Sequence, residues 1–286
     1  MIHQLLDVLQ QRRIRKLDLL ACAVLLGYAM VAFSTQSGVS ISGQGLDPVF
    51  AGVQQRDTLR VAVDLGFYPF SDLQNDELVG YDIDLARAIG DKMGLRVEFV
   101  PTTVEAVYED LSNGKADIAA SALPYAPHQG WRVTFSEFYF NAGQVLVVRK
   151  NTSITGQDQL SNLTIGASLG SDADTYARNL AVRDSSIVVR SEYDLPAEVI
   201  DDLRSDVLDA VIVDNATALS AIGRYNDLKM AEALTLEPYV IVLPREAFLL
   251  RERVNQALED LRDEGFFESN GYKWFVEAPT PTPRPE

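Results

Sequence analysis

The sequence predicts an α/β protein of two lobes, built on mixed and mostly parallel sheets. Strand-like and helix-like segments alternate between residues 58 and 276, as they do in α/β units with parallel strands. One block of this pattern occurs twice in the chain. Two extended apolar segments, 143–149 and 238–244, lie far apart in sequence, as expected of two crossings between lobes.

The internal repeat pairs 107–117, VYEDLSNGKAD, with 199–209, VIDDLRSDVLD. Likewise LRVAVDLG at 59–66 is answered by LTIGASLG at 163–170. In the first pair a helix end with paired acids, a turn and a strand-opening aspartate recur at one spacing. Ordinary α/β units share such patterns by chance, but two similar lobes explain both pairs together.

Composition indicates a folded protein and excludes several function classes. The chain has 286 residues, of which 47% are hydrophobic and 23% charged. Its 25 basic and 41 acidic residues give a net charge of −16, which disfavours a nucleic-acid partner. There is no metal-ligand cluster, nucleophile elbow or phosphate-binding loop, so we expect no cofactor, no metal and no catalytic residue.

The N-terminal segment predicts export. A basic start, 1–16, precedes the apolar segment 17–33, which fits either a cleaved signal peptide or a membrane anchor. Basic residues stay on the cytoplasmic side, so everything after residue 34 is expected at the periplasmic or extracellular face of the membrane. Residues 34–57 are expected to form a flexible tether. Cys22 is the single cysteine, so the exported part has no disulfide.

The first strand and the turn after it predict a ligand site. Residues 59–63 alternate as a strand does, and Asp64 follows at the carboxyl end, where open α/β sheets bind ligands. Phe67, Tyr68 and Phe70 come directly afterwards. Aromatic residues just past a strand end commonly line a binding site, although filling the core is the alternative.

A helix is predicted over 80–94. Asp82 is expected to cap it, and Gly94 to close it. One face carries the apolar side chains Ile83, Ala86, Ile89 and Met93.

The lobes are assigned from the two crossings. Residues 58–145 with 240–276 are expected to form lobe 1, and 146–239 to form lobe 2. Two lobes on a double hinge can close around a ligand that prefers the closed form. The proline-rich end, 277–286, is expected to be an extended tail.

Over about residues 58–276 the chain resembles the type II periplasmic solute-binding proteins of polar amino-acid ABC transporters, solute-binding protein family 3. The motifs that carry the resemblance are VDLGFYPF at 63–70, GYDIDLARAIGDKMG at 80–94, GKADIAASAL at 114–123, FSEFYFNAGQVLVVRK at 135–150 and LDAVIVDNATA at 208–218. The resemblance implies a two-lobed Venus flytrap without chemistry of its own. It also implies delivery of a small polar solute to an ABC permease.

The resemblance also implies site residues. In lobe 1, Asp64 looks like the acid that meets ligand side chains, and Phe67 like the aromatic that stacks over the ligand. The other expected lobe 1 contacts are Phe70, Val104, Ser121, Leu123, Gln129 and Arg132. In lobe 2, Gly170, Ser171 and Asp172 match a loop that helps to hold a carboxylate, and Asp214 matches an acid that pairs with an α-ammonium.

Departures from the family pattern suggest an unusual ligand. Gln129 stands where the family has an arginine that clamps the ligand carboxylate, and Pro124 replaces a hydroxyl residue. Asp172 replaces a neutral Ser or Thr. We therefore expect an amine-bearing solute without an exposed carboxylate. Two alternatives remain open: Asp172 caps a helix, or Arg132 takes over the clamp.

Two rival functions also remain. Proteins similar to this family act as cyclohexadienyl dehydratases through pocket carboxylates, so clustered acids could be catalytic. The second rival function is that of a membrane-anchored sensor module, which reports its ligand to a partner protein.

Overall fold

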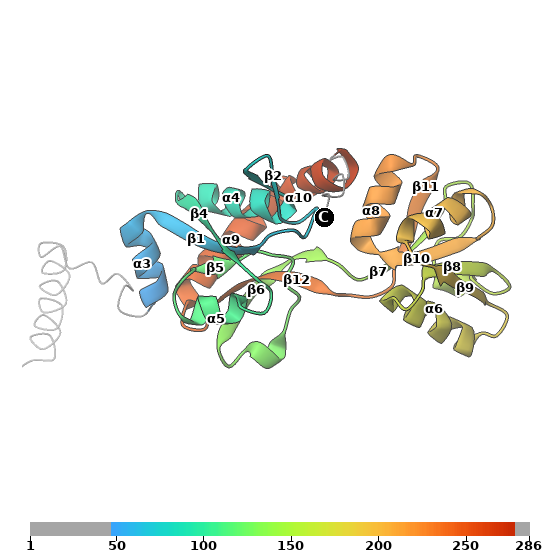
Figure 1. Cartoon of the computed structure of the whole chain (residues 1–286), viewed down its shortest axis with the longest axis horizontal. Helices are drawn as coiled ribbons and strands as arrows, with labels where there is room; N and C mark the ends of the chain where they lie inside the picture. Colours follow the sequence, from blue (N-terminus) through green and yellow to red (C-terminus); the bar gives the residue numbers. More distant parts are fainter. Residues whose placement is uncertain (1–46, 278–286) are drawn as a thin grey trace, which may run out of the picture. The chain divides into compact units, whose positions relative to one another are not determined.

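The structure is a computed structural model that describes residues 47–277 (Figure 1). The basic start, the apolar segment 17–33 with Cys22, the first part of the predicted tether and the tail from residue 278 lie outside the described residues. Within residues 47–277, no helix has both the length and the apolar composition needed to cross a membrane.

The first sheet has five strands in the order β4-β1-β5-β12-β6. Strands β1 (Thr58–Asp64), β4 (Arg96–Thr102) and β5 (Ile118–Ala119) are parallel to one another. Strand β12 (Pro238–Pro244) is antiparallel to both β5 and β6 (Val133–Asn141). The sheet is therefore mixed, as the sequence predicts, but the prediction that it is mostly parallel is wrong, because two of its four strand pairings are antiparallel.

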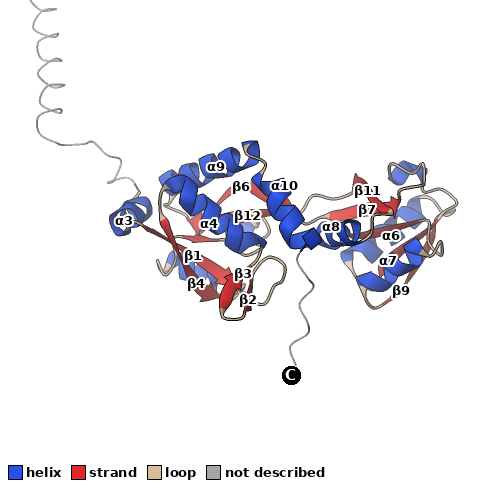
Figure 2. Ribbon diagram, turned by 90° about the horizontal axis from the view of Figure 1, so that it is seen from above, coloured by secondary structure: helices blue, strands red, loops and turns tan. Residues whose placement is uncertain are grey.

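Helices cover the first sheet on both faces, and Figure 2 shows two of them, α4 and α9, next to each other. On one face, α4 (Tyr81–Met93) and α9 (Phe248–Asp263) bury their apolar sides against β1, β5 and β12. On the other face, α5 (Val107–Ser112) packs against Ala62 and Ala119. The remaining elements of this lobe are the hairpin β2 (Asp72–Gln74) and β3 (Glu77–Val79), η2 (Pro127–Gln129), α10 (Phe266–Gly271) and η4 (Tyr272–Glu277).

The second sheet also has five strands, in the order β11-β7-β10-β8-β9. They are β7 (Gln144–Arg149), β8 (Thr164–Ser168), β9 (Val188–Tyr193), β10 (Ala210–Asp214) and β11 (Leu228–Ala233). Alternate β7 side chains serve two cores: Val145 and Val147 pack toward α7 (Pro196–Arg204) and α8 (Asn215–Arg224), whereas Leu146 and Val148 pack toward α6 (Asp172–Arg183). A short turn, η3 (Gln157–Gln159), precedes β8.

The internal repeat is confirmed by hydrogen bonds. The carboxylate of Asp117 accepts from the Arg60 N–H at 2.9 Å, and the Asp117 N–H donates to the Arg60 carbonyl. In the second sheet, Asp209 makes the same two bonds with Thr164, and its carboxylate lies 2.8 Å from the Thr164 nitrogen. In each sheet the strand-opening aspartate ties its strand to the start of the neighbouring parallel strand.

The chain leaves the first sheet after Asn141 and returns to it at Pro238. At the crossing, Asn141 Oδ1 accepts from the Gly143 and Glu237 N–H groups, and its amide donates to the Thr235 carbonyl at 3.2 Å. Thr235 Oγ1 accepts from the Gln144 N–H at 2.7 Å. The predicted lobe limits stay predictions. The structure adds that both predicted crossing segments are strands and that the chain changes sheets just before β7 and just before β12.

The tether prediction is corrected at its end, because residues 48–56 form helix α3 (Pro48–Arg56). Asp47 is fully buried and caps α3 through the Phe50 N–H at 2.8 Å. Its second oxygen accepts from the Leu249 N–H at 2.8 Å at the start of α9. At the other end of α3, Arg56 pairs with Asp117. This segment is therefore part of the first lobe.

Helix α4 ends at Gly94 as predicted, with Gly94 in the left-handed region at φ 67°. The prediction that Asp82 caps this helix is wrong. The N-cap is Gly80, at φ 139°, where a Cβ would lie 2.1 Å from the Phe70 carbonyl oxygen. Only glycine allows this approach, so α4 begins directly against the Phe67–Phe70 turn and Asp82 falls inside its first turn.

Replacing Asp47 by alanine is expected to destabilise the protein. Asp47→Ala leaves buried N–H groups at the starts of α3 and α9 without acceptors, which costs about 2–4 kcal/mol in total. Urea unfolding measures the change. The control is Asp91→Ala, on the exposed side of α4, which should stay within about 0.5 kcal/mol of the parent. Equal unfolding midpoints for the two variants would contradict the double capping role.

Candidate functional site

The first half of the candidate site lies at the carboxyl ends of β1 and β5. Asp64 is the last residue of β1, and its N–H donates to Ser121 Oγ at 2.9 Å. The Ser71 hydroxyl donates to the Asp64 carbonyl at 2.5 Å, and Asp64 Oδ2 accepts from the Val104 N–H at 3.1 Å. These bonds fix the Asp64 backbone and one carboxylate oxygen. Its other oxygen, Oδ1, makes no bond with a described residue and is available to a ligand.

Phe67 forms an aromatic platform beside this acid. Phe67 is 50% exposed, and its ring stacks on that of Phe70, with centroids 5.6 Å apart and planes 14° from parallel. Phe70 is itself 3% exposed and makes edge contacts with the rings of Tyr81, Phe140, Tyr239 and Phe275. One face of Phe67 is thus supported by the core, while much of the ring is left for a ligand to cover.

The predicted lobe 1 contacts divide into exposed and buried residues. Val104 is 49% exposed, and its N–H is held by Asp64. Phe70 and Leu123 are 3% and 1% exposed, so they lie in the core beneath the site, and their contact with a ligand stays a prediction. Ser121, at 4%, is also buried, and its hydroxyl oxygen accepts from the Asp64 backbone.

Gln129 and Arg132 interact with each other. Arg132 Nε donates to Gln129 Oε1 at 2.9 Å, and its guanidinium lies over the Tyr108 ring, 4.9 Å from the centroid. Arg132 also lines a shallow hollow of about 360 Å³ with Glu109 and Arg245. It makes no bond to Asp64 or Ser121, so nothing in its contacts directs it to a carboxylate bound beside them.

The second half of the site begins at the N-terminus of α6. Ser171 is the N-cap and accepts from the Asp174 N–H at 3.1 Å, so the alternative that Asp172 caps this helix is wrong. Asp172 is exposed and makes no hydrogen bond or ion pair with a described residue. The Gly170 N–H donates to Asp174 Oδ2 at 3.1 Å, so the protein's own carboxylate already occupies this donor.

Asp174 is a buried acid that the sequence did not single out. It pairs with Arg178 at 2.7 Å. Burial alone would raise the pKa of Asp174, but bonds from Gly170, Arg178 and Ser191 together lower it. The acid therefore stays ionised at neutral pH. A negative charge next to the Gly170 N–H disfavours a ligand carboxylate at this loop.

Asp214 ends β10 and caps α8. Its Oδ1 accepts from the Thr217 N–H at 2.9 Å and its Oδ2 from the Thr217 hydroxyl at 2.6 Å. Both oxygens keep a free lone pair, because a carboxylate can accept about four hydrogen bonds. Asp214 is half-buried and can still accept from an ammonium group.

Most of the predicted residues thus form two sets near strand ends, β1 and β5 in the first sheet and β8 and β10 in the second. Gln129, at the end of η2, and Arg132, just before β6, lie outside these sets. Among the described residues, no hydrogen bond or ion pair joins one set to the other. The residues that hold the sets in place are above all Ser71, Asp82 and Asp174. The sequence analysis gave Asp82 a different role, as a helix cap, and did not single out the other two. Their signal is a polar residue near a strand end, which is too common to be specific.

Asp82 has the most strongly perturbed electrostatics near the site. Its side chain is fully buried, and Oδ2 accepts from the Ala122 N–H at 2.5 Å. The Tyr139 hydroxyl faces it, and neither this hydroxyl nor Asp82 Oδ1 completes a hydrogen bond of ordinary geometry. Burial raises the pKa of Asp82 to about 7, against smaller lowering effects of Ala122 and Tyr139.

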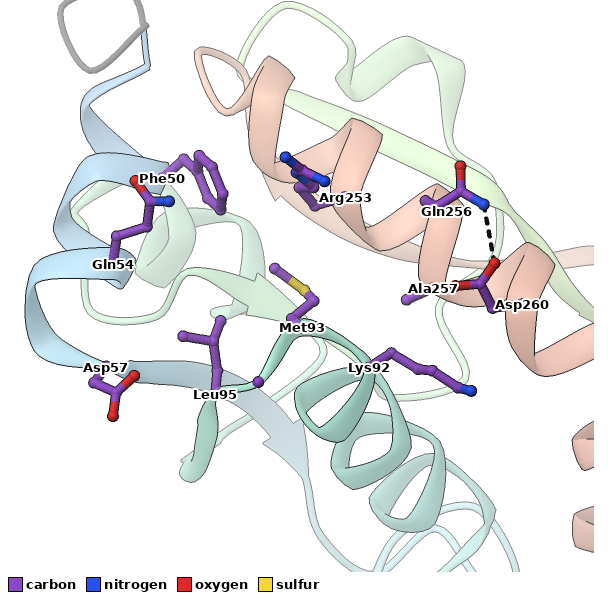
Figure 3. A pocket seen from close by; sticks show the side chains of 11 residues that line it. Phe50, Gln54, Asp57, Lys92, Met93, Leu95, Arg253, Gln256, Ala257 and Asp260 are labelled. Atoms are coloured by element: carbon purple, nitrogen blue, oxygen red, sulfur yellow. Dashed lines mark hydrogen bonds between the residues drawn. The ribbon is translucent and has the colours of Figure 1, made fainter. Parts of the chain in front are cut away.

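A second concave feature lies elsewhere on the first lobe. A pocket of about 520 Å³ is lined by residues of α3, α4 and α9, among them Phe50, Lys92, Met93 and Arg253 (Figure 3). None of the predicted site residues lines it. The described residues hold no cluster of three or more His, Cys, Asp or Glu side chains that could bind a metal.

The family model for bacterial extracellular solute-binding proteins, family 3, matches residues 59–277. The chain belongs to this family. The family match therefore confirms the resemblance, and its members are extracellular proteins that bind solutes.

Two curated relatives cover most of the chain. The arginine-binding extracellular protein ArtP of Bacillus subtilis (strain 168) is 24% identical over 92% of this chain and 98% of its own length. A probable histidine-binding protein of Neisseria gonorrhoeae is 27% identical over 87% of this chain and 94% of its own length.

Solved structures confirm the fold. An ancestral cationic amino acid solute-binding protein is 29% identical, with a TM-score of 0.60 over 79% of this chain and 98% of its own. A polar amino acid uptake protein of Streptococcus thermophilus has a TM-score of 0.70 over 82% of this chain and 92% of its own, at 24% identity. The chain therefore has the two-lobed fold of type II periplasmic binding proteins.

Stability is expected to depend on pH through Asp82. Its folded pKa of about 7 lies above the ordinary aspartate value of 3.8, so the folded state binds this proton more tightly than the unfolded state does. The contribution of Asp82 to the unfolding free energy therefore falls as pH rises from about 4 to about 7, and is constant above that. Thermal unfolding of the parent and of Asp82→Asn across this range measures the difference.

Because Asp82→Asn cannot ionise, the parent should lose stability relative to this variant as pH rises through the window. A constant difference between the two proteins from pH 4 to pH 8 would show that Asp82 titrates normally.

Proposed function

We propose that the chain is the extracytoplasmic solute-binding component of an ABC-type transport system for an amino acid or a related small amine-bearing solute. The observation that carries this proposal is the family match over residues 59–277, together with predicted contact residues at the strand ends of both sheets. Relatives named for arginine and histidine support a nitrogen-bearing polar ligand.

Within this class, the contacts favour a cation without an exposed carboxylate over a free amino acid. Asp64 Oδ1 and the Asp172 side chain have no hydrogen-bond or ion-pair partner within residues 47–277, and Asp214 keeps lone pairs to accept from an ammonium group. Arg132 is engaged with Gln129 and Tyr108. An ammonium or guanidinium group over Phe67 gains a further cation–π attraction of about 0.5–2 kcal/mol.

The N-terminal segment supports a location at the outer face of the cytoplasmic membrane. The basic start and the apolar segment 17–33 precede helix α3, and α3 is fixed to the first lobe through Asp47 and Arg56. An uncleaved anchor would thus hold the first lobe near its partner, whether an ABC permease or a sensor protein. A dehydratase of the same fold, an ancestral cyclohexadienyl dehydratase at 24% identity, supports the fold alone.

A ligand panel tests the proposed function. Thermal unfolding of the full chain is measured with agmatine, putrescine, choline, L-arginine, L-glutamine and glucose. A ligand that binds only the folded state raises stability by about 2.7 kcal/mol at one hundred times its Kd. We expect the carboxylate-free amines to raise the unfolding temperature most. A shift with L-glutamine and none with the amines would contradict the ligand class.

Three variants test the acids and the lost clamp. Asp172→Asn and Asp214→Asn should each weaken amine binding roughly 10- to 100-fold, since each removes one charged hydrogen-bond acceptor. Gln129→Arg should restore a bidentate carboxylate clamp and strengthen L-arginine binding. Unchanged amine affinity in both aspartate variants would sink the acidic-site proposal, while a shift with no compound in the panel would count against solute binding itself.

A further inference from the structure

Ala122 has an unusual backbone conformation beside the candidate site. Its φ of 47° lies in the left-handed region, which a non-glycine residue occupies at a cost of roughly 1–2 kcal/mol. It follows Ser121, whose hydroxyl accepts from the Asp64 N–H. Such a conformation persists only where the surroundings hold it, and strained residues of this kind cluster at binding sites.

The group that holds Ala122 is the Asp82 carboxyl. Asp82 Oδ2 accepts from the Ala122 N–H at 2.5 Å, across forty residues of sequence and from a different element. Asp82 is fully buried and Ala122 is 7% exposed. The bond is therefore shielded from water, and no water molecule can replace the acceptor without opening the core.

Asp82 is in turn fixed to the aromatic platform. The Tyr81 N–H donates to the Pro69 carbonyl and the Asp82 N–H to the Phe70 carbonyl, each at 2.9 Å. The start of α4 therefore connects the Phe67–Phe70 turn on one side with Ala122 on the other. Asp82 therefore bonds to both parts of the lobe 1 site: the turn that carries the Phe67 platform, and the backbone next to the Ser121–Asp64 pair.

Within the part of the chain that the structure describes, no cation pairs with Asp82. The titratable groups around Asp82 are the hydroxyls of three tyrosines: Tyr139 on β6, Tyr239 on β12, and Tyr81, which precedes Asp82 in α4. No ion pair of the described residues involves Asp82. A buried acid without a counter-ion costs stability, so packing alone does not explain it.

We propose that Asp82 is a positioning residue of the solute site: its buried carboxyl holds the Ala122 N–H and so sets Ser121 and Asp64 for the ligand. The expected effect of Asp82 on ligand affinity rests on the proposed solute-binding function. The structural half of the proposal, that Asp82 fixes the backbone of residues 121–123, does not depend on any ligand.

Hydrogen exchange of the ligand-free full chain tests the structural half. In Asp82→Ala, backbone amides in a peptide covering 116–126 should exchange at least about ten-fold faster, because Ala122 loses its acceptor. Peptides covering β8, 164–168, should be unchanged. Asp82→Asn keeps an oxygen acceptor of the same shape and should retain the parent's protection.

Asp117→Ala is the matched control. Asp117 is a buried acid just before β5, at the opposite end of this strand from Ala122. Removing its carboxylate removes the bonds to Arg56 and Arg60. It should lower stability without accelerating exchange at 121–123 more than elsewhere. Exchange that rises equally in both sheets in Asp82→Ala, as in any globally weakened protein, would overturn the proposal.

Affinity for L-arginine and agmatine, by titration calorimetry, tests the functional half. Asp82→Ala should weaken whichever compound the parent binds by about ten-fold or more, and Ala122→Gly added to it should recover part of the loss, since glycine adopts the left-handed conformation freely. If Asp82→Ala does not fold, Ala122→Val strains the same residue from the other side and should weaken binding.

The outcomes separate the two proposals. A parent that binds neither compound counts against the proposed function, while the exchange result still decides the role of Asp82. Unchanged affinity in folded Asp82→Ala, or a double variant no better than Asp82→Ala, would show that Asp82 is merely structural.

Discussion

The structure depends on the hydrogen bonds by which the chain passes between its two sheets at Asn141 and Thr235. Asn141 satisfies backbone groups of both passing segments, and the Thr235 hydroxyl binds the first residue of β7. Gly143 must be glycine here, because a Cβ would lie 2.3 Å from the Thr235 carbonyl oxygen. At the crossing, side chains thus provide the hydrogen-bond partners of the backbone groups. In the strands on either side, the neighbouring strands provide them.

The two lobes use one building plan for different purposes. In each, an aspartate at the start of a strand ties two parallel strands together, and polar side chains gather at the opposite end. The first lobe offers an exposed aromatic face beside Asp64, and the second offers acids at the starts of two helices, Asp172 and Asp214. The aromatic surface is therefore supplied by the first lobe, whereas both lobes supply acids.

Sequence patterns predict the features that depend on local chemistry. The alternation of apolar and polar residues predicts the strands, and the repeated strand-opening aspartates predict two similar lobes. Asp82 was assigned to a helix cap because an acid near a helix start is usually a cap; its true partner, Ala122, is distant in sequence and is a backbone N–H without a sequence signal. Phe70 and Phe67 look alike in the sequence, and only packing distinguishes the buried ring from the exposed one.

The strand order of the first sheet has a consequence for how the protein folds. Strand β12 lies between β5 and β6, although residues 142–237 separate it from β6 in sequence. During synthesis or export, β5 and β6 appear long before β12. The strand edges that pair with β12 therefore stay unpaired until nearly the whole chain has emerged. All strands of the second sheet lie within 144–233, so that lobe can fold first, and the incomplete sheet before it is the species that a chaperone would need to protect from aggregation.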